Sequence, residues 1–172
     1  MSSYSIPILN AHTIPDADTS STDVYFEPTR TAFATDAIPG YMVCAFANQA
    51  ARQGLAGKFT VPMNYTTAPQ IVVKAAATAT GSTVVWDFEY RARGATEAMG
   101  SSAWDSTTPT VNMSLAGTAA RDLQQATMAM TAGDLAADDE VEFRLLRDGA
   151  NTSDTYAGTV WLFGLSFKYA DS

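Results

Sequence analysis

Apolar and polar residues alternate along most of the chain after about residue 41, the pattern of strands with one buried face. The clearest example is STVVWDFEYRAR, residues 82–93. One face of this segment is apolar and aromatic, so we expect it to lie in a core, and the other is mostly polar, so we expect it to face solvent. The expected core face carries Val84, Trp86, Phe88 and Tyr90, and the expected solvent face carries Val85, Asp87, Glu89 and Arg91.

Two segments near the C-terminus have the same period of two. In DEVEFRLLR, residues 139–147, the side chains assigned to the core are Val141, Phe143 and Leu145, and those assigned outward are Glu142, Arg144 and Leu146. In TVWLFGLSFKY, residues 159–169, the odd positions form the expected core face: Trp161, Phe163, Leu165, Phe167 and Tyr169. Gly164, on the opposite face, permits a bend or a close neighbour. Trp86 and Trp161 are both predicted to be core residues.

Weaker strand patterns cover residues 41–47, 57–62, 69–79, 109–117 and 123–132, with turn-rich links between them. Residues 48–58 are the stretch most open to a helix, which Gly54 and Gly57 would limit to about two turns. Residues 118–130 also contain good helix formers, but we favour a strand because the flanking pattern is β throughout. About seven or eight short strands at these spacings predict an all-β sandwich.

Residues 1–38 lack the alternating pattern of the predicted sandwich domain, residues 39–172. Pro7, Pro15 and Pro28 lie in this segment and Pro39 follows it, which favours an extended arm over core elements. The arm is nevertheless rich in apolar side chains. We expect it to be ordered by packing along its own domain or a neighbour, with an unstructured terminus as the alternative. Its candidate interface residues are Tyr4, Ile6, Ile8, Leu9, Ile14, Tyr25 and Phe26.

Length and charge narrow the class of protein. A chain of 172 residues suits one domain and can bury a sizeable core without disulfides. The net charge of −8 disfavours binding to nucleic acid and to anionic membranes. The N-terminus has neither the positive region nor the apolar run of a signal peptide, so we expect a protein made in a cytoplasm and not secreted.

The usual catalytic and metal-binding sets are missing from the sequence. His12 and Cys44 are the single histidine and the single cysteine, which excludes a zinc site of His and Cys ligands unless subunits share them. A Ser-His-Asp triad would have to use His12, which we expect to be a solvated or packing residue of the arm. Cys44 is expected to act as a small buried hydrophobe. Neither common glycine-rich phosphate loop occurs. We therefore predict no enzyme activity and no cofactor.

Two weaker chemical candidates remain. Asp87 and Glu89 lie about 7 Å apart on one strand face, a separation open to an inverting glycosidase, but an exposed polar face explains them better. Calcium could be held near Asp148, Asn151 and Asp154, or in the acidic stretch 137–142, although neither spacing matches an EF-hand loop. Trp104, in the longest loop, is a candidate for an exposed contact with a sugar or with another protein.

The segments FTVPMNY (59–65), VVWDFEYRAR (84–93), VEFRLLRD (141–148), DGANTSDTYAG (148–158) and VWLFGLSFKY (160–169) together resemble a family of small bacteriophage virion proteins. The resemblance covers about residues 58–169. It implies a jelly-roll β-sandwich of about eight antiparallel strands, preceded by the extended N-terminal arm. Members of this family resemble capsid decoration, or cement, proteins and related head and tail accessory proteins.

The resemblance implies a structural role in the virion. A cement protein would bind the outside of a phage head and stabilise it by bridging neighbouring capsomers, with the major capsid protein as partner. Such proteins often form homotrimers at threefold positions and use terminal arms to lock neighbours. The alternative is a receptor-binding or carbohydrate-binding module of a tail or head fibre.

The stretch RDGANTSDTYAG, residues 147–158, is best explained as a structural corner. In a jelly roll the last two strands belong to opposite sheets, so this connection should cross the sandwich. Asp148 and Gly149 are expected to supply a turn that uses the conformational freedom of glycine. Arg147 is expected to pair with Asp154 and brace the corner.

Overall fold

The computed structural model describes residues 2–8, 29–33, 41–48, 52–98, 103–107, 109–117 and 119–171. Within these ranges the chain forms ten strands and one short 3-10 helix. No helix in the described part is long and apolar enough to cross a membrane. The elements are β1 (Ser3–Pro7), β2 (Thr29–Phe33), β3 (Tyr41–Phe46), β4 (Gln53–Thr60), β5 (Thr67–Ala77), β6 (Thr83–Arg93), β7 (Thr110–Ser114), β8 (Gln124–Ala129), η1 (Ala132–Asp134), β9 (Glu140–Arg147) and β10 (Val160–Ala170).

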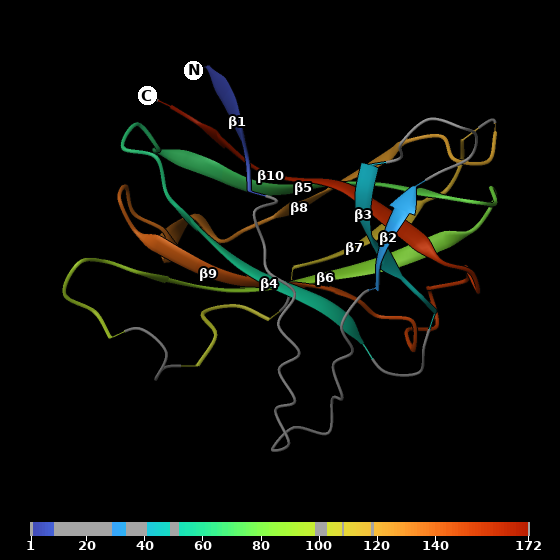
Figure 1. Ribbon diagram of the computed structural model, residues 1–172. Helices are drawn as coiled ribbons and strands as arrows, with labels where there is room; N and C mark the ends of the chain where they lie inside the picture. The colour runs from blue at the N-terminus through green and yellow to red at the C-terminus, as the bar shows by residue number, and fades with distance from the viewer. Residues whose placement is uncertain are drawn as a thin grey trace.

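The strands form two antiparallel sheets that face each other (Figure 1). One sheet has the order β2-β3-β10-β5-β8, with β1 also paired to β10, and the other has the order β4-β9-β6-β7. From β3 onward the chain changes sheet at every connection except β6 to β7. Four strands of each sheet, β3-β10-β5-β8 and β4-β9-β6-β7, thus make an eight-stranded jelly roll. The fold predicted from the sequence is confirmed.

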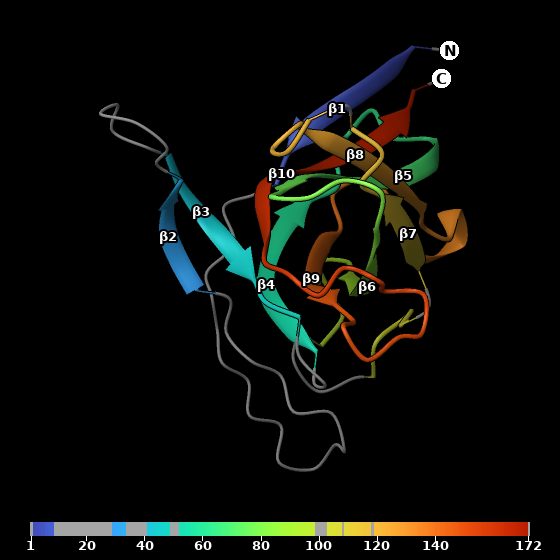
Figure 2. The same ribbon diagram turned by 90° about the vertical axis from the view of Figure 1, so that its right-hand side faces the viewer.

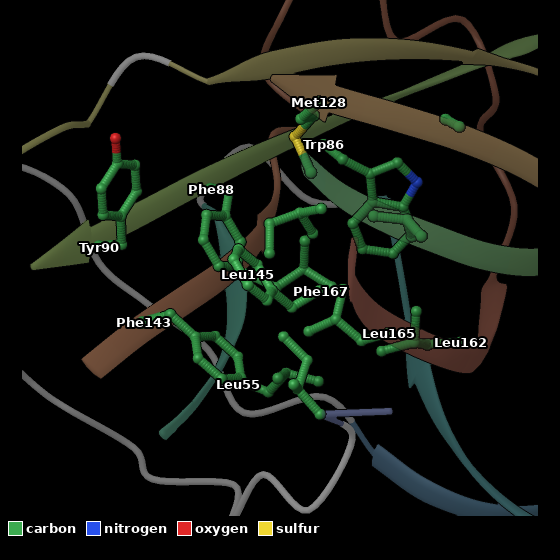
Figure 3. Packing of buried hydrophobic residues seen from close by; sticks show 14 of the residues in the cluster. Leu55, Trp86, Phe88, Tyr90, Met128, Phe143, Leu145, Leu162, Leu165 and Phe167 are labelled. Atoms are coloured by element: carbon green, nitrogen blue, oxygen red, sulfur yellow. The ribbon is translucent and has the colours of Figure 1, made fainter. Parts of the chain in front are cut away.

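The inner faces of both sheets supply one hydrophobic core (Figure 3). Trp86, Phe88 and Tyr90 of β6 are fully buried, as their alternation predicts. Phe88 stacks on Phe143 of β9, with ring centroids 5.3 Å apart. Trp86 and Phe46 of the opposite sheet form a T-shaped pair, with ring centroids 5.0 Å apart. The aromatic side chains that the sequence assigned to the core therefore pack between the two sheets.

Residues 53–60 are a strand, so the helical interpretation of residues 48–58 is wrong for their described second half. All eight residues of β4 pair with β9. Gly54 lies opposite Leu146, and a Cβ at this position would come within 2.3 Å of a Leu146 methyl group. Any larger residue here would force the Leu146 side chain to move. The segment 123–132 contains strand β8, as favoured from the sequence.

The predicted core face of β10 is correct in its second half and wrong in its first. Leu165, Phe167 and Tyr169 are buried as expected. The pairing with β5 shifts between Leu162 and Gly164, a β-bulge that reverses the direction of the side chains. Val160 and Leu162 consequently enter the core, whereas Trp161 and Phe163 are only half-buried. Trp161 is not the core residue that the alternation predicted.

The described parts of the predicted arm, residues 1–38, join the six-stranded sheet. Strand β1 pairs with the end of β10, and β2 pairs with β3. Ile8 is 2% exposed and belongs to the core of its own chain, and its contact with a second subunit stays a prediction. Tyr4 is 41% exposed and Ile6 is partly buried. The other candidate interface positions, Leu9, Ile14, Tyr25 and Phe26, and also His12, lie outside the described residues.

The β2–β3 ribbon stands apart from the sandwich (Figure 2). Strand β3 pairs with β10 only at its last three residues, Cys44 to Phe46. Its first residues, from Tyr41 to Val43, pair with β2 alone among the described strands. Cys44 is half-buried against the core, close to its predicted role. Whether residue 38 is the boundary of an arm stays a prediction.

Candidate functional site

The outer face of the four-stranded sheet carries a ladder of opposite charges, formed by β6 and β9 and called the charged face below. Across these strands Glu89 lies opposite Arg144, and Arg91 lies opposite Glu142. The Nε of Arg144 lies 3.2 Å from Oε2 of Glu89, and the Nε of Arg91 donates to Oε2 of Glu142. Directly opposed charges on one sheet face stabilise the pairing of the strands. The polar positions of two predicted strands are therefore brought together.

Asp87 and Glu89 are buried, each 4% exposed, which corrects the expectation that they line a solvent-exposed face. Arg52, just before β4, approaches both carboxylates at 3.4 Å. The hydroxyl of Thr110 donates to Oδ1 of Asp87 at 2.7 Å. The guanidinium groups of Arg52 and Arg144 thus pair with carboxylates that a glycosidase would need for its substrate. The geometry gives no support to a glycosidase pair.

Trp104, the candidate for an exposed contact, lies over the charged face as a half-buried side chain. The guanidinium carbon of Arg144 is 4.3 Å from the Trp104 ring centroid, and that of Arg91 is 5.2 Å away. Both are cation–π contacts. The next residue, Asp105, fixes the loop because it accepts from the Ala92 amide at 2.7 Å and from Arg93 at 2.8 Å. The loop therefore holds the indole against two arginines.

An open cleft of about 640 Å³ lies beside this loop, at one end of the sandwich. Its carboxylates already serve the fold: Asp105 binds Arg93, Glu97 accepts from the Gly94 amide, and Asp139 accepts from the Ala136 amide. Asp134 accepts a 2.7 Å hydrogen bond from the Tyr90 hydroxyl. Burial, and then this bond, raise the pKa of Tyr90 above its usual value. The cleft is acidic, but its carboxylate oxygens already accept hydrogen bonds from donors of the protein.

The described residues contain no group of three or more His, Cys, Asp or Glu arranged to hold a metal ion. The first calcium candidate fails for a visible reason. Asp154 is bound to Arg147, the Asn151 side chain accepts from the Ser153 amide, and Asp148 faces Arg52 at 3.9 Å. These oxygens therefore point to separate partners and not toward one ion.

Arg147 is the centre of the corner between β9 and β10, and it is 1% exposed. Its Nε and Nη2 donate to the two carboxylate oxygens of Asp154, each at 3.0 Å. Nη1 donates to the carbonyls of Phe46 (3.0 Å) and Gly158 (2.7 Å), and Nη2 also donates to the carbonyl of Tyr156. All five guanidinium donors are thus used. The expected pairing of Arg147 with Asp154 is present.

The corner connects β9 in one sheet to β10 in the other, as the jelly-roll order requires. It is hydrogen-bonded to the first residues of β6. Val85 donates to Asp154, and the amides of Asp148 and Thr155 donate to the carbonyls of Val85 and Thr83. One expectation is wrong: among the described glycines only Gly81 has a positive φ, so the turn does not use the conformational freedom of Gly149. The corner is fixed by the Arg147–Asp154 pair together with these backbone hydrogen bonds.

Comparison with known proteins adds little to this geometry. No family model and no curated protein matches the chain. Among solved structures, the CBM35 from Cellvibrio japonicus Abf62 is 12% identical with a TM-score of 0.46, covering 99% of each chain. The carbohydrate-binding module TmCBM27, described by its recognition of mannan, is 7% identical with a TM-score of 0.40, over 98% of this chain and 88% of its own. At these values neither likeness assigns a ligand to this chain.

Proposed function

We propose that the protein is a structural virion protein, a capsid decoration or cement protein that binds the outside of a phage head and stabilises it by bridging neighbouring capsomers. In this role it has no catalytic activity, and it acts as a homo-oligomer, with a trimer as the expected form. The major capsid protein is its partner. The family resemblance is one support for this proposal, and the arrangement of the N-terminal strands is the other.

The observation that carries the proposal is the β2–β3 ribbon. In the described part of the chain, the outer half of this ribbon, from Tyr41 to Val43 on β3, has β2 as its only partner strand. A two-stranded ribbon is marginally stable by itself in water. Contact with a second protein would stabilise it, because β2 is the last strand of its sheet in the described part of the chain and its outer backbone edge can pair with a further strand. A projecting ribbon on a compact sandwich suits a bridge between subunits.

The distribution of charge is compatible with a position on the outside of a phage head. Basic side chains are mostly neutralised within the fold, including Arg52, Arg91, Arg93, Arg144 and Arg147. Because the chain carries a net charge of −8, the remaining surface is acidic. Such a surface repels nucleic acid, which suits a protein on the outer side of a DNA-filled shell.

The test is binding to heads of the phage that encodes this chain. Purified full-length protein should co-sediment with DNA-filled heads and raise the temperature at which they release DNA. The variant Thr31→Pro should lose both effects, because proline removes a backbone donor from the middle of β2. The matched control Thr31→Val keeps the strand and should bind normally. Failure of the wild-type protein to co-sediment would contradict the proposal.

A carbohydrate-binding module is the second candidate, favoured by Trp104, which lies on the charged face and precedes Asp105, a residue that lines the 640 Å³ cleft. A half-exposed indole beside carboxylates and guanidinium groups offers both stacking and hydrogen bonding to a sugar. Retention on immobilised cell-surface polysaccharide, lost in Trp104→Ala, would favour this function. The cement proposal predicts no retention for either protein and normal head binding by the variant.

A further inference from the structure

Strands β1 and β3 share one edge of β10. Strand β1 pairs with β10 from Ser166 to Ala170, and β3 pairs with it from Val160 to Leu162. Both strands run antiparallel to β10, so they lie end to end along the same edge. On the other edge, β5 pairs with β10 along nearly its whole length. Strand β1 is therefore a separate piece of chain that fills half of an edge.

Side chains of β1 contribute little to its attachment. The strand is exposed at Ser3, Tyr4, Ser5 and Pro7, and partly buried at Ile6. Its one fully buried anchor is Ile8, which follows the strand. Tyr4 lies on the surface of Tyr169, with ring centroids 5.6 Å apart. Backbone pairing and one buried side chain thus hold β1, and both would be the same on the β10 edge of another copy.

The outward edge of β1 is not built to accept a further strand. The Ile8 amide donates to the Leu165 carbonyl at 2.9 Å, and the Asp171 amide donates to the Ser2 carbonyl at 3.2 Å. In an antiparallel pair the backbone groups of alternate residues point to opposite edges, so residues 3, 5 and 7 point away from β10. Pro7 has no amide hydrogen to offer there, which is how edge strands resist addition. Pro7 thus disfavours association through this edge while β1 is in place.

A long stretch of sequence separates β1 from β2. About 20 residues, 9–28, join Ile8 to Thr29. A chain of this length spans at most roughly 70 Å, enough to reach a neighbouring subunit. Exchange of an identical element between protomers needs no new interface, because each contact broken in one copy is made in another.

We propose that β1 is an exchangeable strand: it pairs with β10 of its own chain in the isolated subunit and with β10 of a second copy in the oligomer. The occupant of the edge is the same segment, Ser3 to Ile8, in the same register. This inference names the segment and the acceptor edge for the oligomer in the proposed function, and it depends only on the oligomeric part of that proposal. Heads and capsid protein are not needed to test it.

The test uses two single-cysteine chains in a Cys44→Ala background. Ser5 lies opposite Lys168, and both side chains are exposed. They form a non-hydrogen-bonded pair, in which the Cα atoms are about 4.5 Å apart, within the range that a disulfide can join. One chain carries Ser5→Cys, and the other carries Lys168→Cys and an affinity tag. Neither chain alone can form this bond within itself.

Exchange predicts a disulfide between the two different chains after they are mixed, incubated at high concentration and oxidised, in several-fold excess over either homodimer. The Ser5→Cys, Lys168→Cys double variant should form covalent oligomers whose proportion rises with protein concentration. If these changes disturb folding, Ser3→Cys and Ala170→Cys repeat the test at the next non-hydrogen-bonded pair of the two strands. Heterodimers no more frequent than homodimers, or only intrachain bonds in the double variants, would overturn the exchange. Normal head binding in that case would leave the cement function intact.

Discussion

The link between β9 and β10 is anchored by buried side chains, whereas β1 is anchored to β10 mainly by backbone pairing. In the link, Arg147 is 1% exposed and bonded to both oxygens of Asp154. In β1, four of five side chains are exposed. The link cannot open without leaving a buried charge unpaired, which is costly. Strand β1 can leave and find an identical edge. Elements that take part in binding or exchange come from the less stable parts of a fold.

The largest effect should come from breaking the corner. Asp154→Ala leaves the Arg147 guanidinium buried without its carboxylate, and we expect a loss of about 3–5 kcal/mol in the free energy of unfolding. Urea denaturation measures it. The control is Glu140→Ala, which removes the partner of the well-exposed Lys58 and should cost less than about 1 kcal/mol. Equal, small losses in both variants would show that the corner is not the anchor described here.

A smaller loss is expected at the one buried anchor of the N-terminal edge. Ile8→Ala removes a side chain that is 2% exposed, which typically costs about 2–5 kcal/mol in a core. Because an edge segment can adjust around the space, we expect about 2–3 kcal/mol by urea denaturation. Ile6→Ala, at a partly buried position, should cost less. If Ile8→Ala were as stable as the wild type, β1 would not be docked on β10.

A pH effect should come next. Burial raises the pKa of Tyr90 above the usual value of 10.0. Below about pH 10 the phenol is protonated in both the folded and the unfolded chain. Above it, the unfolded chain loses the proton first, so the free energy of unfolding falls as pH rises. Urea denaturation between about pH 8 and pH 11 should show this decline, less steep in Tyr90→Phe. Burial also raises the pKa of Tyr65, so some decline should remain. Equal slopes would contradict the assignment to Tyr90.

The smallest effect is expected at Trp104. Trp104→Ala removes contacts with Arg91 and Arg144 on the charged face, and cation–π contacts of this kind contribute about 1 kcal/mol. Leu123→Ala, at a side chain that is 56% exposed, is the matched control and should leave the free energy of unfolding unchanged. A loss as large as that of Asp154→Ala would place Trp104 among the main supports of the fold.

The fold could be predicted because the clearest strands show an alternation of apolar and polar residues in their own sequence. In β6, burial of Trp86, Phe88 and Tyr90 follows directly from alternation with polar residues. Strand β4 was read only in part because Gly54, Ala56 and Gly57 have low strand propensity. Its conformation depends on β9, whose Leu146 side chain packs over Gly54 and would have to move for a larger residue. The faces of β10 were half wrong because a bulge reverses them, and Gly164 was the only signal in the sequence.

The candidate site was harder to predict than the fold. Alternation places Asp87 and Glu89 on the outer face, but it cannot show that Arg52 and Arg144 bury them there. The matching order of charges on β6 and β9 was a usable signal, because antiparallel pairing sets Glu89 against Arg144. Arg52 carried no such signal, since it lay in the stretch most open to a helix. The pairing of Arg147 with Asp154 was predictable because both residues lie in one short connection.

The central claim is that this jelly roll is part of the outer shell of a virion, and cryo-electron microscopy of intact particles tests it most directly. The account predicts density for the sandwich on the outside of the head, as a trimer that bridges capsomers, with the β2–β3 ribbon in contact with a neighbour. Particles whose heads carry no density for this protein would contradict the account.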